Sequence, residues 1–162
     1  MKDYLYPNDW VCNFGASHTL EYAFSCYAAA QMAKAIGKTA AYDTLMQYSY
    51  AYKNLFDPET KYMRPREMDG SFMKDFEPLK GWKGFQEGNA AQYTWYVPHD
   101  IQGLIELMGI DLFNERLENT FIESRKTQFG GGKEIDSFSG VEKLYNQGNQ
   151  PCLHDAWLFN YS

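Results

Sequence analysis

The sequence predicts an all-α fold of helical hairpins joined by long, aromatic loops. Apolar residues recur at helical spacing in several stretches, and no stretch alternates apolar and polar residues as a half-buried strand does. Glycines and prolines punctuate the chain between the helical stretches. This pattern is typical of a toroid of helical hairpins or of a helical repeat array, but the sequence has no repeat of fixed period. We expect a single unit over residues 1–162, without an internal boundary.

Two helices are predicted in the first third of the chain. The first runs from about Ser17 to Ile36 and ends at Gly37, and we expect it to be buried because it is apolar on nearly all sides. The second runs from Thr39, its predicted N-cap, to Lys53, so the short turn between them makes an antiparallel hairpin. His18 and Glu21 lie on the first turn of the first helix. We interpret both as structural, with a functional role as the alternative.

A long loop is predicted over residues 54–84, where prolines and glycines interrupt the chain. Loops of this length are usually functional or disordered, and the five aromatic residues within it argue against disorder. Arg64 and Arg66 can hold a carboxylate or sugar hydroxyls. Structural pairing with Glu67 or Asp69 is the interpretation that we favour for both.

A lone carboxylate, Glu87, lies among aromatic residues and side-chain amides in the stretch GFQEGNAAQYTWYVPHD, residues 84–100. Sugar-binding sites combine these residue types. Gly88 and Asn89 place Glu87 in a loop, directly before a short aromatic segment that ends at Pro98. Burial beside its aromatic neighbours would favour the protonated carboxyl that a general acid needs. The alternative is a surface glutamate that precedes an aromatic helix of the core.

Further helices are predicted after this stretch. Asp100 caps a helix that continues through Met108 and ends at Gly109, and Asp111 caps the next one. Gly130 to Gly132 form a flexible turn and not a phosphate loop, because no Lys and Ser or Thr follow. The stretch from Pro151 to Tyr161 is predicted to begin another helix.

Composition excludes several classes of function. The formal charge of −6, without a cluster of Lys and Arg, argues against a nucleic-acid partner. No apolar run approaches the ~18 residues of a membrane span, and the first residues do not have the pattern of a signal peptide. The three cysteines are widely spaced, so we expect free thiols and neither a disulfide framework nor a zinc site.

Four stretches carry a resemblance to a known family. In chain order they are HTLEYAFSCYAAAQMAKAIGK, YKNLFDPETKYMRPREMDGSF, EGNAAQYTWYVPHD followed by IQGLIELMG, and GNQPCLHDAWLFNY. They resemble family 92 of the glycoside hydrolases, the calcium-dependent, inverting exo-α-mannosidases. The chain departs from the family pattern at Ala91, after Gly109, where a second glycine is usual, and at Gln150, where the family has an acidic residue.

The resemblance implies that the chain is an incomplete (α/α)6 toroid, an internal part of the family's catalytic domain. The implied activity is release of terminal α-linked mannose from mannosides or N-glycans with inversion, with Glu87 as general acid. We expect Gln92, Trp95 and Arg66 to contact the mannose-containing glycan. The family's catalytic base lies in a later segment that this sequence lacks. We therefore expect the chain alone to be inactive and to work with the remainder of the same catalytic domain.

The resemblance also implies a calcium ion, with Asn149 and Gln150 as candidate ligands. Both offer neutral amide oxygens where the family has more charge, so we expect weaker calcium binding or an altered subsite. The sequence itself does not indicate a compartment, although the family is commonly periplasmic or secreted. The competing hypothesis is a noncatalytic helical scaffold that binds carbohydrate or protein, in which Glu87 is incidental.

Overall fold

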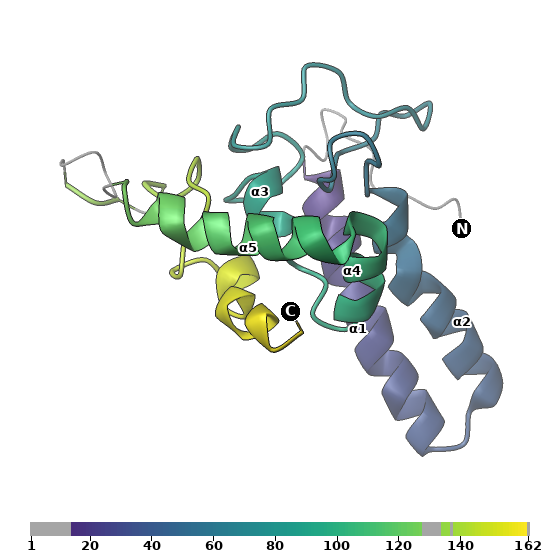
Figure 1. Cartoon of the computed structure of the whole chain (residues 1–162). Helices are drawn as coiled ribbons and strands as arrows, with labels where there is room; N and C mark the ends of the chain where they lie inside the picture. Colours follow the sequence, from purple (N-terminus) through teal and green to yellow (C-terminus); the bar gives the residue numbers. More distant parts are fainter. Residues whose placement is uncertain (1–13, 128–133, 137, 162) are drawn as a thin grey trace.

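The computed structural model describes residues 14–127, 134–136 and 138–161. Figure 1 shows its arrangement. In these parts of the chain two residue pairs form isolated β-bridges, and no strand is present. The all-α prediction is therefore confirmed. The α-helices are α1 (Gly15–Ala35), α2 (Thr39–Ser49), α3 (Ala90–Tyr93), α4 (Ile101–Met108) and α5 (Ile110–Ser124), and the 3-10 helices are η1 (Tyr50–Asn54), η3 (Gln150–Cys152) and η4 (Asp155–Tyr161).

The predicted hairpin is formed by α1 and α2, which lie side by side and extend away from the rest of the chain (Figure 1). Gly37 reverses the chain with a φ of 72°, a conformation that glycine adopts without steric cost. The projecting part of α1 is not buried as expected, because no further layer covers it. Met32 is 71% exposed and Ile36 is 72% exposed.

The second helix differs from its prediction at both ends. Thr39 is the first helical residue rather than the N-cap, and no side chain caps the helix. At Tyr50 the helix tightens into η1, so the α-helical part ends before Lys53. Tyr52, on η1, is completely buried. The tighter turn therefore carries the chain from the exposed hairpin into the core.

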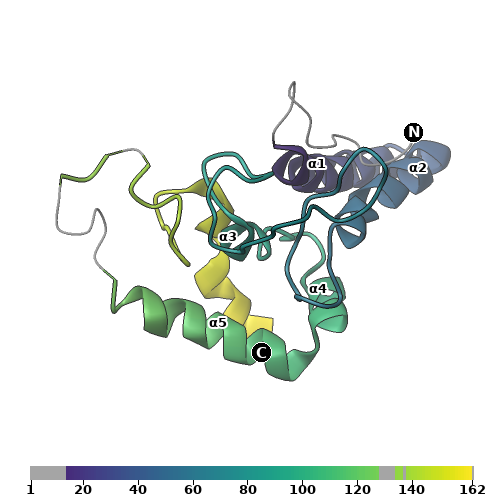
Figure 2. The same cartoon turned by 90° about the horizontal axis from the view of Figure 1, so that it is seen from above.

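The hydrophobic core lies around α3 and the residues that follow it. Seen from above, α3 lies between α1 and α5 (Figure 2). Trp95 packs edge-on against Phe113 of α5, with ring centroids 5.4 Å apart. The largest fully buried side chains are Trp95, Tyr52, Phe85, Phe113, Leu20 and Met63.

The helix predicted after Asp100 is confirmed as α4, and its start is fixed by side-chain hydrogen bonds. Asp100 Oδ1 accepts from the Gly103 amide at 3.1 Å, while its Oδ2 accepts from the buried Tyr52 hydroxyl at 2.6 Å. Gly103 cannot carry a side chain here, because a Cβ would lie 2.3 Å from that hydroxyl. Gly109, with a φ of 90°, ends α4 as predicted.

Gly109 is also the N-cap of α5, so the prediction that Asp111 caps this helix is wrong. Asp111 lies instead within the first turn, where its charge interacts favourably with the helix dipole. The helix buries Phe113, Leu117 and Thr120.

The long loop is confirmed as a segment without α-helix or strand, but it is held by many contacts. Isolated bridges pair Phe56 with Met63 and Arg66 with Phe72. Arg64 forms an ion pair of 2.9 Å with Asp57, so the predicted pairing with Glu67 or Asp69 is wrong for this arginine. Asp57 is nearer because the chain reverses between residues 57 and 61, where the Lys61 amide bonds to the Asp57 carbonyl.

The C-terminal segment is helical, as predicted, but of the 3-10 type. The amides of Cys152, Leu153 and Trp157 each bond to the carbonyl three residues earlier, which is the 3-10 pattern. Cys152 and Cys26 are free, as expected. Cys12 and Gly130 to Gly132 lie outside the described residues. Among the helices that are described, none has the length and apolar character needed to cross a membrane.

Asp155 generates a prediction about stability and pH. Its side chain is fully buried. The groups beside its carboxylate are the Cys152 thiol and, at 3.9 Å, His154 Nδ1, an imidazole whose own pKa is lowered by burial. Burial raises the pKa of Asp155 to about 8. Because the unfolded carboxyl ionises near pH ~4, the folded state loses stability as the pH rises from about 4 to 8. Asp155→Asn removes this loss. We expect it to stabilise the protein by about 1 kcal/mol at pH 5 and by several kcal/mol at pH 8.5.

Urea unfolding from pH 5 to pH 8.5 measures this effect. Asp43→Asn, at an exposed position of α2, is the matched control and should leave the free energy of unfolding unchanged at every pH. Parallel pH curves for the protein and for Asp155→Asn would show that Asp155 does not resist ionisation in the folded state.

Candidate active site

The loop that carries Glu87 is attached to the start of α1 by backbone hydrogen bonds. The Gly84 carbonyl accepts from the amides of Ala16 and Ser17, at 3.1 and 3.2 Å. The Gln86 amide donates to Ser17 Oγ at 3.1 Å. These contacts satisfy amides that α1 cannot bond internally, and they place residues 84–87 beside the first turn of that helix.

Glu87 has an unusual backbone conformation. Its φ is 54°, in the left-handed region, which is costly for a residue with a Cβ. The next residue, Gly88, closes the turn, because its carbonyl accepts from the Trp82 amide at 3.1 Å. Strain of this kind clusters at functional positions. The Glu87 side chain is exposed, so the expected burial among aromatic residues is wrong.

Asn89 holds the other end of this turn and is fully buried. Its Oδ1 accepts from the Gln92 amide at 3.0 Å, which caps α3. Its Nδ2 donates to the carbonyls of Val141 and Lys143 at 2.8 and 2.9 Å. The sequence singled out Asn89 only as a helix breaker. The turn after Glu87 is therefore joined to a segment about fifty residues later.

Gln92 does not reach the pocket in which Glu87 lies. It is fully buried, and its Nε2 donates to the carbonyls of Gly140 and Lys143 at 2.9 and 2.8 Å. The expectation that it contacts substrate has no support in this placement. Its amide instead satisfies backbone groups that would otherwise be buried without partners.

Trp95 and Arg66 also lie away from this pocket. Trp95 is 1% exposed, and its carbonyl accepts from His154 Nε2 at 2.8 Å. Arg66 donates to the Asn54 and Gly70 carbonyls, and its guanidinium lies 3.8 Å from the centre of the Phe72 ring. Neither side chain lines this pocket, so the expectation that they contact the sugar has no support in this placement. Arg66 bonds to backbone carbonyls, so its predicted pairing with Glu67 or Asp69 is wrong as well.

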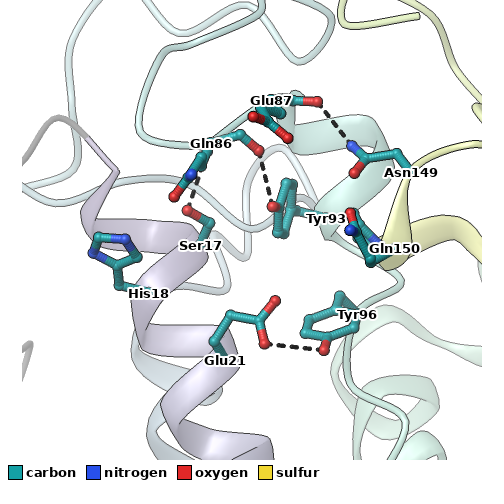
Figure 3. Close-up of a pocket in the computed structure, with 10 residues that line it drawn as sticks. Ser17, His18, Glu21, Gln86, Glu87, Tyr93, Tyr96, Asn149 and Gln150 are labelled. Carbon is teal, nitrogen blue, oxygen red and sulfur yellow. Dashed lines mark hydrogen bonds between the residues drawn. The ribbon is translucent and has the colours of Figure 1, made fainter. Parts of the chain in front are cut away.

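A pocket of about 440 Å³ lies beside Glu87 and is formed by three separate segments. Figure 3 shows Glu87 on one wall, with Glu21 and Tyr96 on the opposite side. Ser17, His18 and Glu21 come from α1, and Asn149 and Gln150 come from the GNQP stretch. The complete lining is Ser17, His18, Glu21, Gln86, Glu87, Tyr93, Tyr96, Asn149, Gln150 and Pro151.

The structure thus brings together Glu87, Asn149 and Gln150, which the sequence predicts as site residues. Asn149 Nδ2 donates to the Glu87 carbonyl at 2.8 Å, so the two stretches touch at the pocket rim. His18 and Glu21, interpreted first as structural, also line the pocket. The signal that could have placed them there is that both are polar side chains near the start of a helix whose other residues are mostly apolar.

The described residues do not form a complete calcium site. Calcium prefers six to eight oxygen ligands, several of them carboxylates. The amide oxygens of Asn149 and Gln150 are suitable donors, but they are neutral. No group of three or more acidic, histidine or cysteine side chains suited to a metal ion occurs within the described parts of the chain. The residues fit a contribution to a calcium site and not a whole one.

Comparison with protein families gives one match over almost the whole chain. The model of the glycosyl hydrolase family 92 catalytic domain matches residues 2–162. A comparison with the curated proteins gives no match.

Solved structures of the same family are similar in sequence and in backbone. The GH92 α-mannosidase BT3965 of Bacteroides thetaiotaomicron is 40% identical with a TM-score of 0.76, over 90% of this chain and 18% of that one. Its complex with mannoimidazole gives 39% identity and a TM-score of 0.77, over 90% and 20%. The inverting mannosidase BT2199 of the same organism is 30% identical with a TM-score of 0.75, over 90% and 20%. The chain thus spans about a fifth of the length of these structures.

The hydrogen bonds of Asn89 predict a large effect on stability. Asn89→Ala removes the cap of α3 and takes one donor each from the buried Val141 carbonyl and the partly buried Lys143 carbonyl. We expect the free energy of unfolding to fall by about 2 to 4 kcal/mol. Chemical denaturation measures it. Asn160→Ala, at an exposed position of η4, should change it by less than about 0.5 kcal/mol. Equal effects of the two substitutions would contradict the bracing role of Asn89.

Proposed function

The chain belongs to glycosyl hydrolase family 92, and we propose that it is part of a glycosidase that releases terminal α-linked mannose from mannosides or N-glycans, with Glu87 as general acid. The observation that carries this proposal is the position of the Glu87 side chain, exposed on the wall of a pocket lined by carboxylate, amide and tyrosine groups. Such groups recognise sugar hydroxyls, and the pocket is large enough for a pyranose ring. Family membership favours this hydrolase over a noncatalytic scaffold.

Inversion of configuration is part of the proposal. An inverting glycosidase uses an acid to protonate the leaving oxygen and a separate base to activate water on the opposite face of the sugar. Glu87 takes the first role, because its exposed carboxyl can reach an oxygen in the pocket. The base is supplied by the remainder of the catalytic domain. Inversion is supported by the similarity to BT2199, an inverting mannosidase. A mannoside substrate is supported by the similarity to BT3965, an α-mannosidase whose structure is known with mannoimidazole.

The same proposal includes an (α/α)6 toroid that this chain forms only in part. The hairpin of α1 and α2 is the repeating unit of such a fold. Large apolar side chains that stay exposed, such as Met32, Ile36 and Trp157, are suited to packing against neighbouring helices of the same domain. The length of the solved relatives is consistent with this arrangement.

A calcium ion, when bound, would orient and polarise sugar hydroxyls near Glu87. We propose that Asn149 and Gln150 contribute amide oxygens to its site and that the remaining ligands come from elsewhere in the catalytic domain. Asn149 has a further role that needs no metal, because its Nδ2 holds the Glu87 carbonyl. The amide at position 149 therefore connects the GNQP stretch to the acid.

Glu87→Gln in the full-length protein tests the acid role. We expect hydrolysis of a mannobiose, whose leaving oxygen needs a proton, to fall by about 10² to 10⁴. Hydrolysis of 2,4-dinitrophenyl α-mannoside should change far less, because its leaving group departs without protonation. Steady-state kinetics on both substrates provide the measurement.

Two controls accompany this experiment. Glu118→Gln, at an exposed position of α5, should leave both rates unchanged. The 162-residue chain alone should release no mannose from either substrate, because it lacks the proposed base. Equal losses on both substrates in Glu87→Gln would contradict the acid role.

Gln150→Glu tests the calcium proposal. An added carboxylate at the pocket should tighten calcium binding by about tenfold, since affinity rises with the charge of the ligands. Calorimetric titration of the full-length protein measures the change. Gln147→Glu adds the same charge at an exposed position that does not line the pocket, and it should have no effect. Unchanged affinity in Gln150→Glu would contradict a ligand role for position 150.

A further inference from the structure

We infer that Glu21 and Tyr96 form a clamp for two sugar hydroxyls on the wall of the pocket that faces Glu87. This inference rests on the proposed function, since it names how the substrate of Glu87 is held. It assigns a binding and positioning role to the pair, distinct from that of the acid. The proposed ligand is a vicinal diol of a mannoside.

The pair joins two segments that are far apart in the chain. Tyr96 Oη donates to Glu21 Oε2 at 3.1 Å, from the segment after α3 to the first part of α1. Both side chains line the pocket. In Figure 3 the second carboxylate oxygen of Glu21 points into the space between this pair and Glu87.

The bond between the two side chains decides what they present to a ligand. Because the Tyr96 proton is donated to Glu21, the hydroxyl oxygen of Tyr96 keeps lone pairs that can accept. Burial, and then the charge of Glu21, raises the pKa of Tyr96 to about 12, so the phenol stays protonated through the neutral range. The pair therefore offers two neighbouring acceptors, Glu21 Oε1 and Tyr96 Oη. Sugar hydroxyls on adjacent carbons are matching donors.

The surroundings fix the geometry of this clamp. Tyr96 packs edge-on against Tyr93, with ring centroids 6.2 Å apart, and against Phe24 at 6.4 Å. Tyr93 in turn donates to the Gln86 carbonyl at 2.9 Å, next to Glu87. The clamp and the acid are thus connected through one tyrosine ring, which sets the place of a bound sugar relative to the acid.

Two other roles for Glu21 make different predictions. If the pair only ties α1 to the segment after α3, an amide at position 21 preserves the tie, because its oxygen still accepts from Tyr96. If Glu21 is a general base, its loss lowers kcat and leaves binding intact. A clamp requires acceptors toward the sugar, and an amide nitrogen in place of Oε1 is a donor. Glu21→Gln therefore separates the three roles.

The experiment measures the full-length protein and its Glu21→Gln and Tyr96→Phe variants. Calorimetry gives the Kd of methyl α-mannoside, and hydrolysis of 4-nitrophenyl α-mannoside gives kcat and KM. We expect Glu21→Gln to raise Kd and KM about 10-fold to 100-fold, the value of a hydrogen bond to a charged group, with kcat changed less than threefold. Tyr96→Phe should raise Kd and KM about threefold to tenfold. Tyr22→Phe, an exposed tyrosine of α1 that does not line the pocket, is the control.

Each outcome decides the inference. Unchanged Kd and KM in Glu21→Gln would overturn the clamp, and so would a large loss of kcat with unchanged Kd. If the protein hydrolyses mannosides while both variants match it, the clamp fails and the proposed function stands. If the protein binds methyl α-mannoside with the predicted losses but hydrolyses no mannoside, the proposed function fails and the clamp stands. Absence of binding to the unmodified protein would overturn the clamp.

Discussion

The pocket depends on how the first amides of α1 are satisfied. No side chain caps this helix, so the Gly84 carbonyl takes that place and accepts from Ala16 and Ser17. An N-terminal amide left buried and unpaired would cost about 1 to 3 kcal/mol, so this contact is strongly favoured. It joins chain segments almost seventy residues apart. Glu21 follows within α1 and Glu87 follows within the loop, so the same contact sets both walls of the pocket.

The sequence predicts the elements with strong local signals. The helix from Asp100 to Gly109 has a side-chain cap at one end and a glycine with positive φ at the other, and both act as predicted. The 3-10 character of the C-terminal segment, and the N-cap of α5, depend on small differences in turn geometry that composition does not encode. Asp111 illustrates this. It lies in the first turn of α5, only two positions after the actual N-cap, Gly109.

The site is harder to predict than the helices, because its composition is shared with the core. Gln92 and Trp95 belong to a stretch rich in aromatic and amide groups, yet both are buried. Which side of a helix as short as α3 faces the pocket is decided by residues 140–143, whose carbonyls bond to Asn89 and Gln92. Those acceptors are backbone atoms, so the side chains of residues 140–143 show no sequence pattern from which the bonds to Asn89 and Gln92 could be predicted. Glu87 stands out in the sequence because a lone carboxylate next to glycine is unusual in such a stretch.

The left-handed backbone at Glu87 has a consequence for protein engineering. In a library of all amino acids at position 87, many variants would lose function because they cannot adopt this backbone conformation, whatever the chemistry of their side chains. Branched residues such as valine and isoleucine are the least compatible with a φ of 54°, whereas asparagine, aspartate and glycine adopt it more readily. Enrichment scores at this position would therefore combine two quantities, the ease of forming the turn and the ability to donate a proton. Only comparison of residues with similar turn preferences would isolate the second.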